Sequence, residues 1–166
     1  MIIYALIVKT LIVYYSYSGH TDHVAKLWAE KLRAKGEVVL QLLKPKKEID
    51  GFGAQCRAAF TGQKPELEEG ISYDVSPYDL VIIGSPVWAF APVPAMNTYL
   101  AKVNGLHGKK AIVLLTSGSG LGVKKCFRNI RVILESKGIS HIDEINIPDR
   151  KQDDEAFIAS SIAAYL

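Results

Sequence analysis

The sequence predicts an α/β fold: a doubly wound, five-stranded parallel sheet with helices on both faces. Short apolar segments rich in β-branched residues alternate along the chain with longer segments that have the 3.6-residue period of amphipathic helices. The strand segments are apolar throughout, which is typical of strands buried on both faces. Strands that alternate with helices pair in parallel through right-handed crossovers, so only a few doubly wound strand orders remain.

The first elements follow one another closely. Residues 10–15 form a β-branched and aromatic run that predicts a buried strand. Residues 21–35 predict a helix because their apolar residues recur at helical spacing, and Gly36 stands where a C-cap belongs. Residues 37–43 predict the second strand.

The connection over residues 44–78 is too long for a simple crossover. Within it, residues 52–60 predict a helix. Residues 63–76 contain few apolar side chains and are expected to run over the surface. The third strand follows at residues 79–84, and residues 94–103 predict a helix with one apolar side.

The last elements continue the alternation. Residues 111–116 predict the fourth strand and residues 139–147 the fifth. Between them, residues 123–137 have the most regular helical period, and Cys126 lies in the apolar stripe, which favours packing over chemistry. Residues 153–165 predict a final helix.

Composition excludes several classes of protein. The chain has 166 residues, which suits a single domain over residues 1–166. Twenty Lys and Arg against 17 Asp and Glu give a net charge of +3 without a basic stripe, so no nucleic acid partner is expected. Two cysteines, far apart and without metal-binding spacing, favour a reducing cytoplasm.

Residues 1–8 (MIIYALIV) form an apolar N-terminal extension. The run is interrupted at Lys9 and is too short for a membrane span, so no membrane partner is expected. It also lacks the basic region and cleavage site of a secretion signal. Three interpretations are open: a long buried first strand, an added edge strand, or a translation start that belongs at Val8.

Three loops carry the candidate chemistry, because ligands of doubly wound sheets bind outside the carboxyl ends of the strands. The first loop offers three Ser and Thr hydroxyls and a glycine at a helix N-terminus, where backbone N–H groups and the helix dipole favour an anion such as phosphate. The alternative is simple N-capping by Ser18 or Thr21. The residues of this loop are Ser16, Tyr17, Ser18, Gly19, His20 and Thr21.

The second loop places two large aromatic side chains in a segment stiffened by prolines. It predicts an exposed stacking surface for a planar ligand, the alternative being that both rings pack into the protein. Its candidate binding residues are Ser85, Pro86, Val87, Trp88, Ala89 and Phe90.

The third loop is rich in glycine, so its backbone can approach the polar edge of a flat ring closely. Its match to dinucleotide-binding and P-loop patterns is incomplete, and it is interpreted as another wall of the same site. Its candidate residues are Thr116, Ser117, Gly118, Ser119, Gly120 and Gly122. No catalytic side chain and no metal site is predicted: His20 and His23, three residues apart, do not by themselves make one.

From Lys9 onward these motifs resemble the flavodoxin-like superfamily. Ser16, Ser18, Gly19 and Thr21 match its phosphate-binding pattern Ser/Thr-x-Ser/Thr-Gly-x-Thr. Residues 78–88 (YDLVIIGSPVW) are similar to the "YDLIIIGxPxW" stretch of a short-chain flavodoxin subgroup, and residues 116–122 resemble its "TSGGSGIG". By analogy with flavodoxin, the resemblance implies strand order 2-1-3-4-5.

The resemblance implies FMN as cofactor, with its phosphate on the first loop, its ring system near Trp88 and the pyrimidine edge beside the third loop. The implied function is electron transfer between redox partner proteins or small acceptors. The alternatives are an NAD(P)H-dependent FMN oxidoreductase acting on quinones or other acceptors, and a flavin-binding regulatory or interaction module.

Three features depart from typical electron-carrier flavodoxins. The third loop has no aromatic residue, so a two-sided ring sandwich is not expected. Ala89 stands where such carriers usually have glycine, and a positive φ is costly for alanine, which predicts weaker semiquinone stabilisation. Such carriers are also usually strongly acidic, whereas this chain is mildly basic.

Overall fold

The computed structural model describes residues 8–165, so the apolar extension and its three interpretations lie outside the described residues except for Val8. Parallel strands pair in the order β2-β1-β3-β5-β6, and the short β4 pairs antiparallel with β3. Without β4, this is the predicted five-stranded order 2-1-3-4-5. The strands are β1 (Thr10–Tyr14), β2 (Val38–Leu42), β3 (Leu80–Trp88), β4 (Ala91–Pro92), β5 (Lys110–Ser117) and β6 (His141–Pro148).

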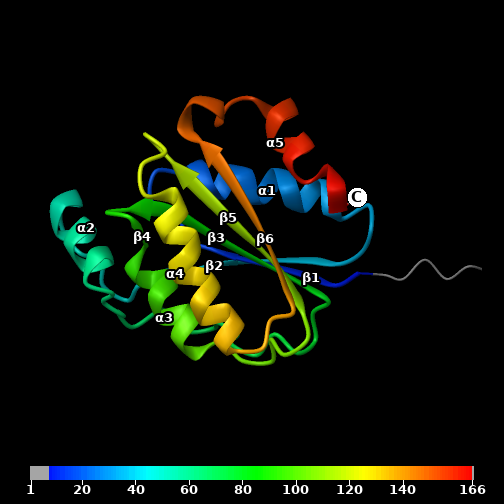
Figure 1. Cartoon of the computed structure of the whole chain (residues 1–166), viewed down its shortest axis with the longest axis horizontal. Helices are drawn as coiled ribbons and strands as arrows, with labels where there is room; N and C mark the ends of the chain where they lie inside the picture. The colour runs from blue at the N-terminus through cyan, green and yellow to red at the C-terminus, as the bar shows by residue number, and fades with distance from the viewer. Residues whose placement is uncertain (1–7, 166) are drawn as a thin grey trace, which may run out of the picture.

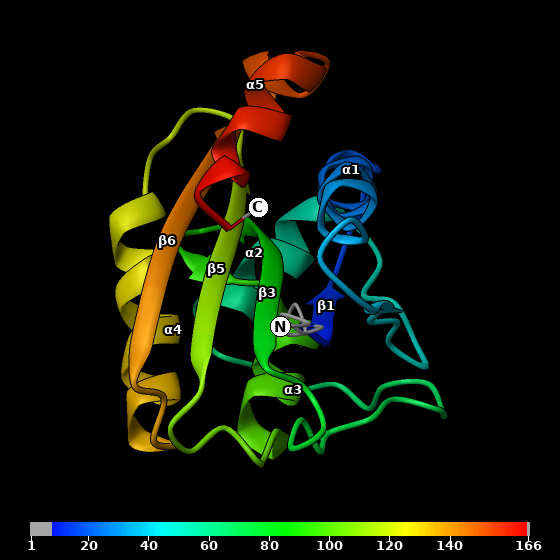
Figure 2. The ribbon, with the colours of Figure 1, turned by 90° about the vertical axis from the view of Figure 1, so that its right-hand side faces the viewer.

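Helices cover both faces of this sheet. Figure 1 shows α3 and α4 crossing one face, with α1 and α5 on the other side. Figure 2, turned by 90°, shows β6, β5, β3 and β1 side by side. Among residues 8–165, no helix is long and apolar enough to cross a membrane. The helices are α1 (His20–Leu32), α2 (Phe52–Phe60), α3 (Pro94–Lys102), α4 (Val123–Ser136) and α5 (Glu155–Ser161), with short 3₁₀ turns at Asp149–Lys151 and Ala163–Tyr165.

Two apolar cores, one on each face, explain why the central strands are apolar throughout. In β1, Leu11 and Val13 pack with α3 and α4, whereas Ile12 and Tyr14 pack with α1 and α5. The same alternation continues in β3 and β5, because successive side chains of a strand point to opposite faces. The carboxyl ends of β1, β3 and β5 therefore meet at one edge, where the three candidate loops lie.

Several predicted boundaries are wrong for identifiable reasons. Helix α1 ends at Leu32, and its C-cap is Arg33, not Gly36. A Cβ at Gly36 would collide with the backbone of Val8, so this glycine permits a close approach of two segments. The final helix begins at Glu155, two residues later than predicted, because Asp154 caps it, accepting a hydrogen bond of 3.0 Å from the N–H of Phe157. It ends at Ser161, before the short 3₁₀ turn at Ala163–Tyr165.

Two boundaries shift around strands. Strand β6 begins at His141, two residues later than expected, because the N–H of Ile139 still bonds the Leu134 carbonyl at the end of α4. Strand β3 continues to Trp88, four residues beyond the predicted end. Its extension changes the second candidate loop.

The long connection over residues 44–78 contains α2 over the predicted residues. The stretch after α2 runs largely over the surface, as expected, but two apolar side chains, Leu67 and Val75, are buried and anchor it. Through this segment α2 is held beside β4, close to the carboxyl end of β3 (Figure 1).

Candidate functional site

A cavity of about 300 Å³ lies at the carboxyl edge of the sheet. All three candidate loops contribute to its wall, together with residues from α2 and from the turn after β6. It is lined by Tyr17, Ser18, His20, Thr21, Phe52, Pro86, Val87, Trp88, Thr116, Ser117, Gly118 and Asp149.

The first loop leads into α1 through a glycine with positive φ. Gly19 is the N-cap, with φ of 94° and no side-chain cap of its own, so the N-capping alternative for Ser18 or Thr21 is wrong. Ser16 Oγ instead accepts a hydrogen bond of 3.2 Å from the N–H of Asp22. Within residues 8–165 the N–H groups of His20 and Thr21, the first two of the helix, have no partner. These amides, at the positive end of the helix dipole, suit an anion.

Hydrogen bonds hold the loops against one another. The hydroxyls of Thr21 and Thr116 lie 2.9 Å apart and are buried, which joins the first loop to the third. His20 Nδ1 lies 3.5 Å from a carboxylate oxygen of Asp149, which joins the first loop to the turn after β6. The cavity wall is therefore preorganised at two points rather than formed by independent loops.

Asp22, in the first turn of α1, is the nearest carboxylate along the chain to this anion site. Tyr14 donates a hydrogen bond of 2.6 Å to Asp22 Oδ1, and Lys26 Nζ lies 2.7 Å from Oδ2. Partial burial alone would raise the pKa of Asp22, but the bonds from Lys26 and Tyr14 outweigh it and lower that pKa. Burial beside this carboxylate in turn raises the pKa of Tyr14. The negative charge of Asp22 is thus compensated locally.

Asp22→Asn is expected to lower the free energy of unfolding at pH 7 by about 1 kcal/mol, because it weakens these charge-assisted bonds. A depressed pKa in the folded state stabilises the fold above the ordinary aspartate pKa of about 3.9, and this contribution is lost as pH falls through the folded-state value. Urea unfolding from neutral to acid pH should therefore show a shallower acid decline for Asp22→Asn than for the original protein. Asp50→Asn, at an exposed position, should leave the decline unchanged.

The second loop is a β-hairpin rather than an irregular loop. Strand β3 runs through Trp88, turns at Ala89 and Phe90, and returns as β4. Both turn residues have positive φ, 47° and 67°. Two consecutive residues of this kind make the mirror-image turn that fits the twist of a two-residue hairpin. Ala89 thus adopts the positive φ that the sequence analysis expected to be costly for alanine.

The two aromatic side chains of the hairpin do not have the expected exposure. Trp88 is only 7% exposed, so its prediction as an exposed stacking ring is wrong. Its ring is surrounded edge-on by Tyr15, Tyr17 and Phe52 at centroid distances of 5.5 to 5.8 Å. Phe90, in contrast, is 46% exposed. Trp88 still lines the cavity, as part of an aromatic wall rather than as a free platform.

Ala89→Gly is expected to raise the free energy of unfolding by up to about 1 kcal/mol. Left-handed backbone costs an L-residue roughly 1–2 kcal/mol, which exceeds the roughly 0.4–1 kcal/mol of entropy that glycine adds to the unfolded state. The control is Ala54→Gly on the exposed side of α2, where the same change should lower stability by about 1 kcal/mol. Thermal melts should move in opposite directions; a loss of stability for Ala89→Gly would show that this turn is not strained.

The third loop contributes its first half to the cavity. Thr116, Ser117 and Gly118 line it, and Ser117 Oγ donates a hydrogen bond of 2.9 Å to Asn146 Oδ1. The second half supports the hairpin instead. Gly122, with φ of 80°, is the N-cap of α4, and a Cβ there would lie 2.8 Å from Phe90 Cα.

The structure therefore brings part of the predicted residue set to the cavity. Eight of the predicted residues do not line it. Ser85 is buried and its hydroxyl is used within the hairpin, bonding Pro86 and Val93. The other seven are Ser16, Gly19, Ala89, Phe90, Ser119, Gly120 and Gly122.

Two lining residues, Phe52 and Asp149, were absent from the predicted set. Asp149 follows the last strand of the sheet, so extending the carboxyl-edge rule to that loop would have found it. Phe52 had only a weak signal, an aromatic residue between two glycines at a helix start. Together the wall offers an anion-binding helix terminus at one end and aromatic side chains along its length. Such a wall suits a flat, apolar ring system that carries an anionic group.

Several known proteins share this fold and part of this sequence. Residues 9–151 match the model of a family described as flavodoxin. The fold is similar to a flavoprotein from Lactobacillus acidophilus in complex with FMN, with 23% identity, 90% of this chain and 99% of the other covered, and a TM-score of 0.69. It is also similar to oxidised flavodoxin 2 from Bacillus cereus (21% identity, 95% and 99% covered, TM-score 0.57).

A third similar structure is an NADH:FMN oxidoreductase in its apo form, with 16% identity, 94% of this chain and 87% of the other covered, and a TM-score of 0.63. No curated protein matches the sequence.

Proposed function

The chain belongs to the flavodoxin family, and from this premise we propose that it binds FMN in the carboxyl-edge cavity and transfers electrons between redox partners. The family and the FMN-bound relative support FMN as the cofactor. When bound, FMN supplies the redox chemistry, and the protein supplies binding, orientation and electrostatics.

The observation that carries this proposal is the start of α1, where the first two backbone N–H groups have no hydrogen-bond partner among the described residues. The amides of His20 and Thr21 and the hydroxyl of Ser18 give a phosphate monoester donors at a positive helix end. Three or four charge-assisted bonds of roughly 1.5–3 kcal/mol each would supply much of the roughly 8 kcal/mol of micromolar binding.

The rest of the cavity fits the ring system. Its volume, about 300 Å³, is at the lower end of the usual range of roughly 300–1,000 Å³ for ligand sites. Trp88, Tyr17 and Phe52 form an apolar aromatic wall on one side, and the third loop offers polar groups and a close backbone on the other. Asp149 Oδ1 lies 3.5 Å from His20 Nδ1, and a carboxylate in the cavity wall can accept a hydrogen bond from a hydroxyl group of the ligand.

The first experiment is a flavin titration. Protein freed of any bound flavin is titrated with FMN and, separately, with riboflavin, following flavin fluorescence. We expect FMN to bind at micromolar concentration or tighter and riboflavin to bind at least about tenfold more weakly, since only FMN uses the α1 terminus. Failure to take up FMN would overturn the proposal.

A second candidate function, NAD(P)H-dependent reduction of quinones, has one observation in its favour. The third loop presents only small side chains to the cavity, Thr116, Ser117 and Gly118, which would leave one face of a flat ligand open to a second substrate. Steady-state NADH and NADPH oxidation with a quinone separates the two. For an electron carrier, turnover should not exceed that of the same concentration of free FMN.

The cellular setting stays a proposal as well. Both cysteines are free thiols, Cys126 buried in the core under α4 and Cys56 partly buried in α2, and this supports the cytoplasm as the compartment.

A further inference from the structure

Charge is unevenly distributed along the chain. Between Asp79 and Glu135 there is no acidic residue, whereas this stretch holds seven Lys and Arg. Three of these cations, Lys124, Lys125 and Arg128, are exposed on the first turns of α4, near the carboxyl edge of the sheet. Within the part of the chain that the structure describes, none of the three takes part in an ion pair.

Two exposed aromatic rings gather around one of these cations. Lys125 Nζ lies 5.7 Å from the ring centroid of Phe60 and 5.9 Å from that of Phe90. Phe60, at the end of α2, is 64% exposed, and Phe90, in the hairpin turn, is 46% exposed. Both rings are costly to leave in water, and Phe90 is presented by a turn with two positive φ values.

A groove of about 460 Å³ continues from this point between α2, α3 and α4. Its floor includes the apolar residues Ala91, Pro92 and Ile133, and its charged lining residues are Lys64 and Lys137, with no carboxylate among the described lining residues. The hairpin connects the groove to the cavity: Trp88 lines the cavity, and Ala91 and Pro92, which follow the turn, line the groove. We call Phe60, Phe90, Lys125, Arg128 and this groove the basic face.

We propose that the basic face docks an acidic redox protein, which thereby comes beside the flavin cavity. This inference rests on the proposed electron-transfer function and adds the chemistry of the partner. Aromatic residues and arginine are enriched in protein interfaces, and rows of unpaired cations select partners of opposite charge and accelerate encounter. The expected partner surface is therefore acidic, with an apolar centre to cover the two rings.

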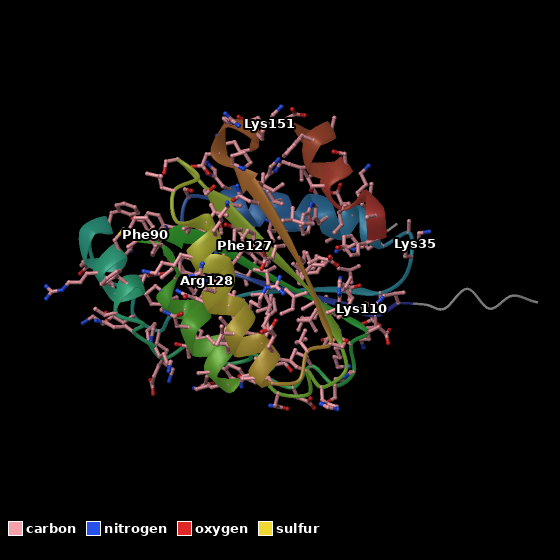
Figure 3. All side chains as sticks on the ribbon, in the orientation of Figure 1. Lys35, Phe90, Lys110, Phe127, Arg128 and Lys151 are labelled. Atoms are coloured by element: carbon pink, nitrogen blue, oxygen red, sulfur yellow. The ribbon has the colours of Figure 1, made fainter. Side chains whose placement is uncertain are left out.

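The test compares two matched charge reversals in the FMN-loaded protein. Lys125→Glu with Arg128→Glu changes the basic face, and Lys35→Glu with Lys110→Glu makes the same change in net charge elsewhere. Figure 3 shows Arg128 toward the end of the molecule that carries Phe90, and Lys35 and Lys110 at the opposite end. Lys125→Gln with Arg128→Gln removes the charges without adding acidic groups.

The probes are an acidic plant-type ferredoxin and a basic cytochrome c. In stopped flow, one electron passes from the reduced iron–sulfur cluster to the flavin, or from the reduced flavin to the ferric haem. At an ionic strength of about 10 mM, the reversal on the basic face should lower the second-order rate with ferredoxin about tenfold or more, and the neutral variant by less. The difference should shrink at about 0.5 M salt. The same reversal should raise the rate with cytochrome c.

Three outcomes would overturn the proposal: an equal loss in the Lys35/Lys110 control, a ferredoxin rate independent of salt, or sedimentation showing that the face joins two copies of this chain. Calorimetric titration of oxidised ferredoxin into flavin-free protein keeps the two proposals distinguishable. Charge-dependent ferredoxin binding without FMN uptake would refute the proposed function and support the docking face. FMN uptake without charge-dependent ferredoxin binding would support the proposed function and refute the docking face.

Discussion

Ser18→Asp is expected to raise the dissociation constant for FMN at least about 100-fold while changing that for riboflavin by less than about threefold. Ser18 lies in the cavity wall just before the unpartnered amides of His20 and Thr21. The change removes a hydroxyl donor and places a carboxylate beside a phosphate dianion. The lost charge-assisted bond costs roughly 1.5–3 kcal/mol, and like charges a few ångströms apart near a surface add a term of similar size. Riboflavin lacks the phosphate and should not sense the charge.

Two variants control this measurement. Ser18→Ala removes the donor without adding charge and should weaken FMN binding only about tenfold. Ser119→Asp adds the same charge to the third loop at a residue that does not line the cavity, and should have little effect. Fluorescence titration of flavin-free protein measures all three. An equal loss of riboflavin and FMN affinity for Ser18→Asp would place the damage in the ring site or the fold, and would refute the assignment of this loop to phosphate.

The strands of the sheet could be predicted because the apolar pattern that identifies each strand lies within its own short segment. An apolar run such as that of β5, buried on both faces, has few alternatives to a central parallel strand. The end of β3 could not be read in this way. Residues 85–88 contain a serine and a proline, and they continue the strand only because β4 and β5 supply pairing partners. Similarly, Gly36 looked like a helix cap, but its role depends on the backbone of Val8, which is remote in sequence.

The site, too, has features that the sequence predicts and features that depend on residues far along the chain. Its location follows from topology, and its phosphate-binding pattern from a short motif, so both could be predicted. The exposure of Trp88 and Phe90 could not, because it depends on partners far along the chain. Tyr15 and Phe52 bury the tryptophan, and the positive φ values of the turn direct the phenylalanine outward onto Gly122. A pair of adjacent aromatic residues in a sequence does not reveal which one a later segment will cover.

Gly122→Ala is expected to lower the free energy of unfolding by about 2–4 kcal/mol. A positive φ costs alanine roughly 1–2 kcal/mol, and the new methyl group would press on Phe90, with Phe90 Cα only 2.8 Å away, adding an overpacking cost of roughly 1–3 kcal/mol. For a chain of this length the melting temperature should fall by about 6–12 °C. Because Phe90 belongs to the hairpin that carries Trp88, the loss should also weaken FMN binding.

The matched control is Gly120→Ala in the same loop. Gly120 has a similar φ of 75°, but a Cβ there meets nothing within 4 Å among residues 8–165, so only the backbone cost of about 1 kcal/mol applies. The difference between the two variants isolates the contact with Phe90. Phe90→Ala introduced together with Gly122→Ala should recover only part of the overpacking cost, because it removes the ring atoms of Phe90 from the new methyl group but leaves Phe90 Cα in place. If the two glycine variants melt at the same temperature, Phe90 does not rest on Gly122.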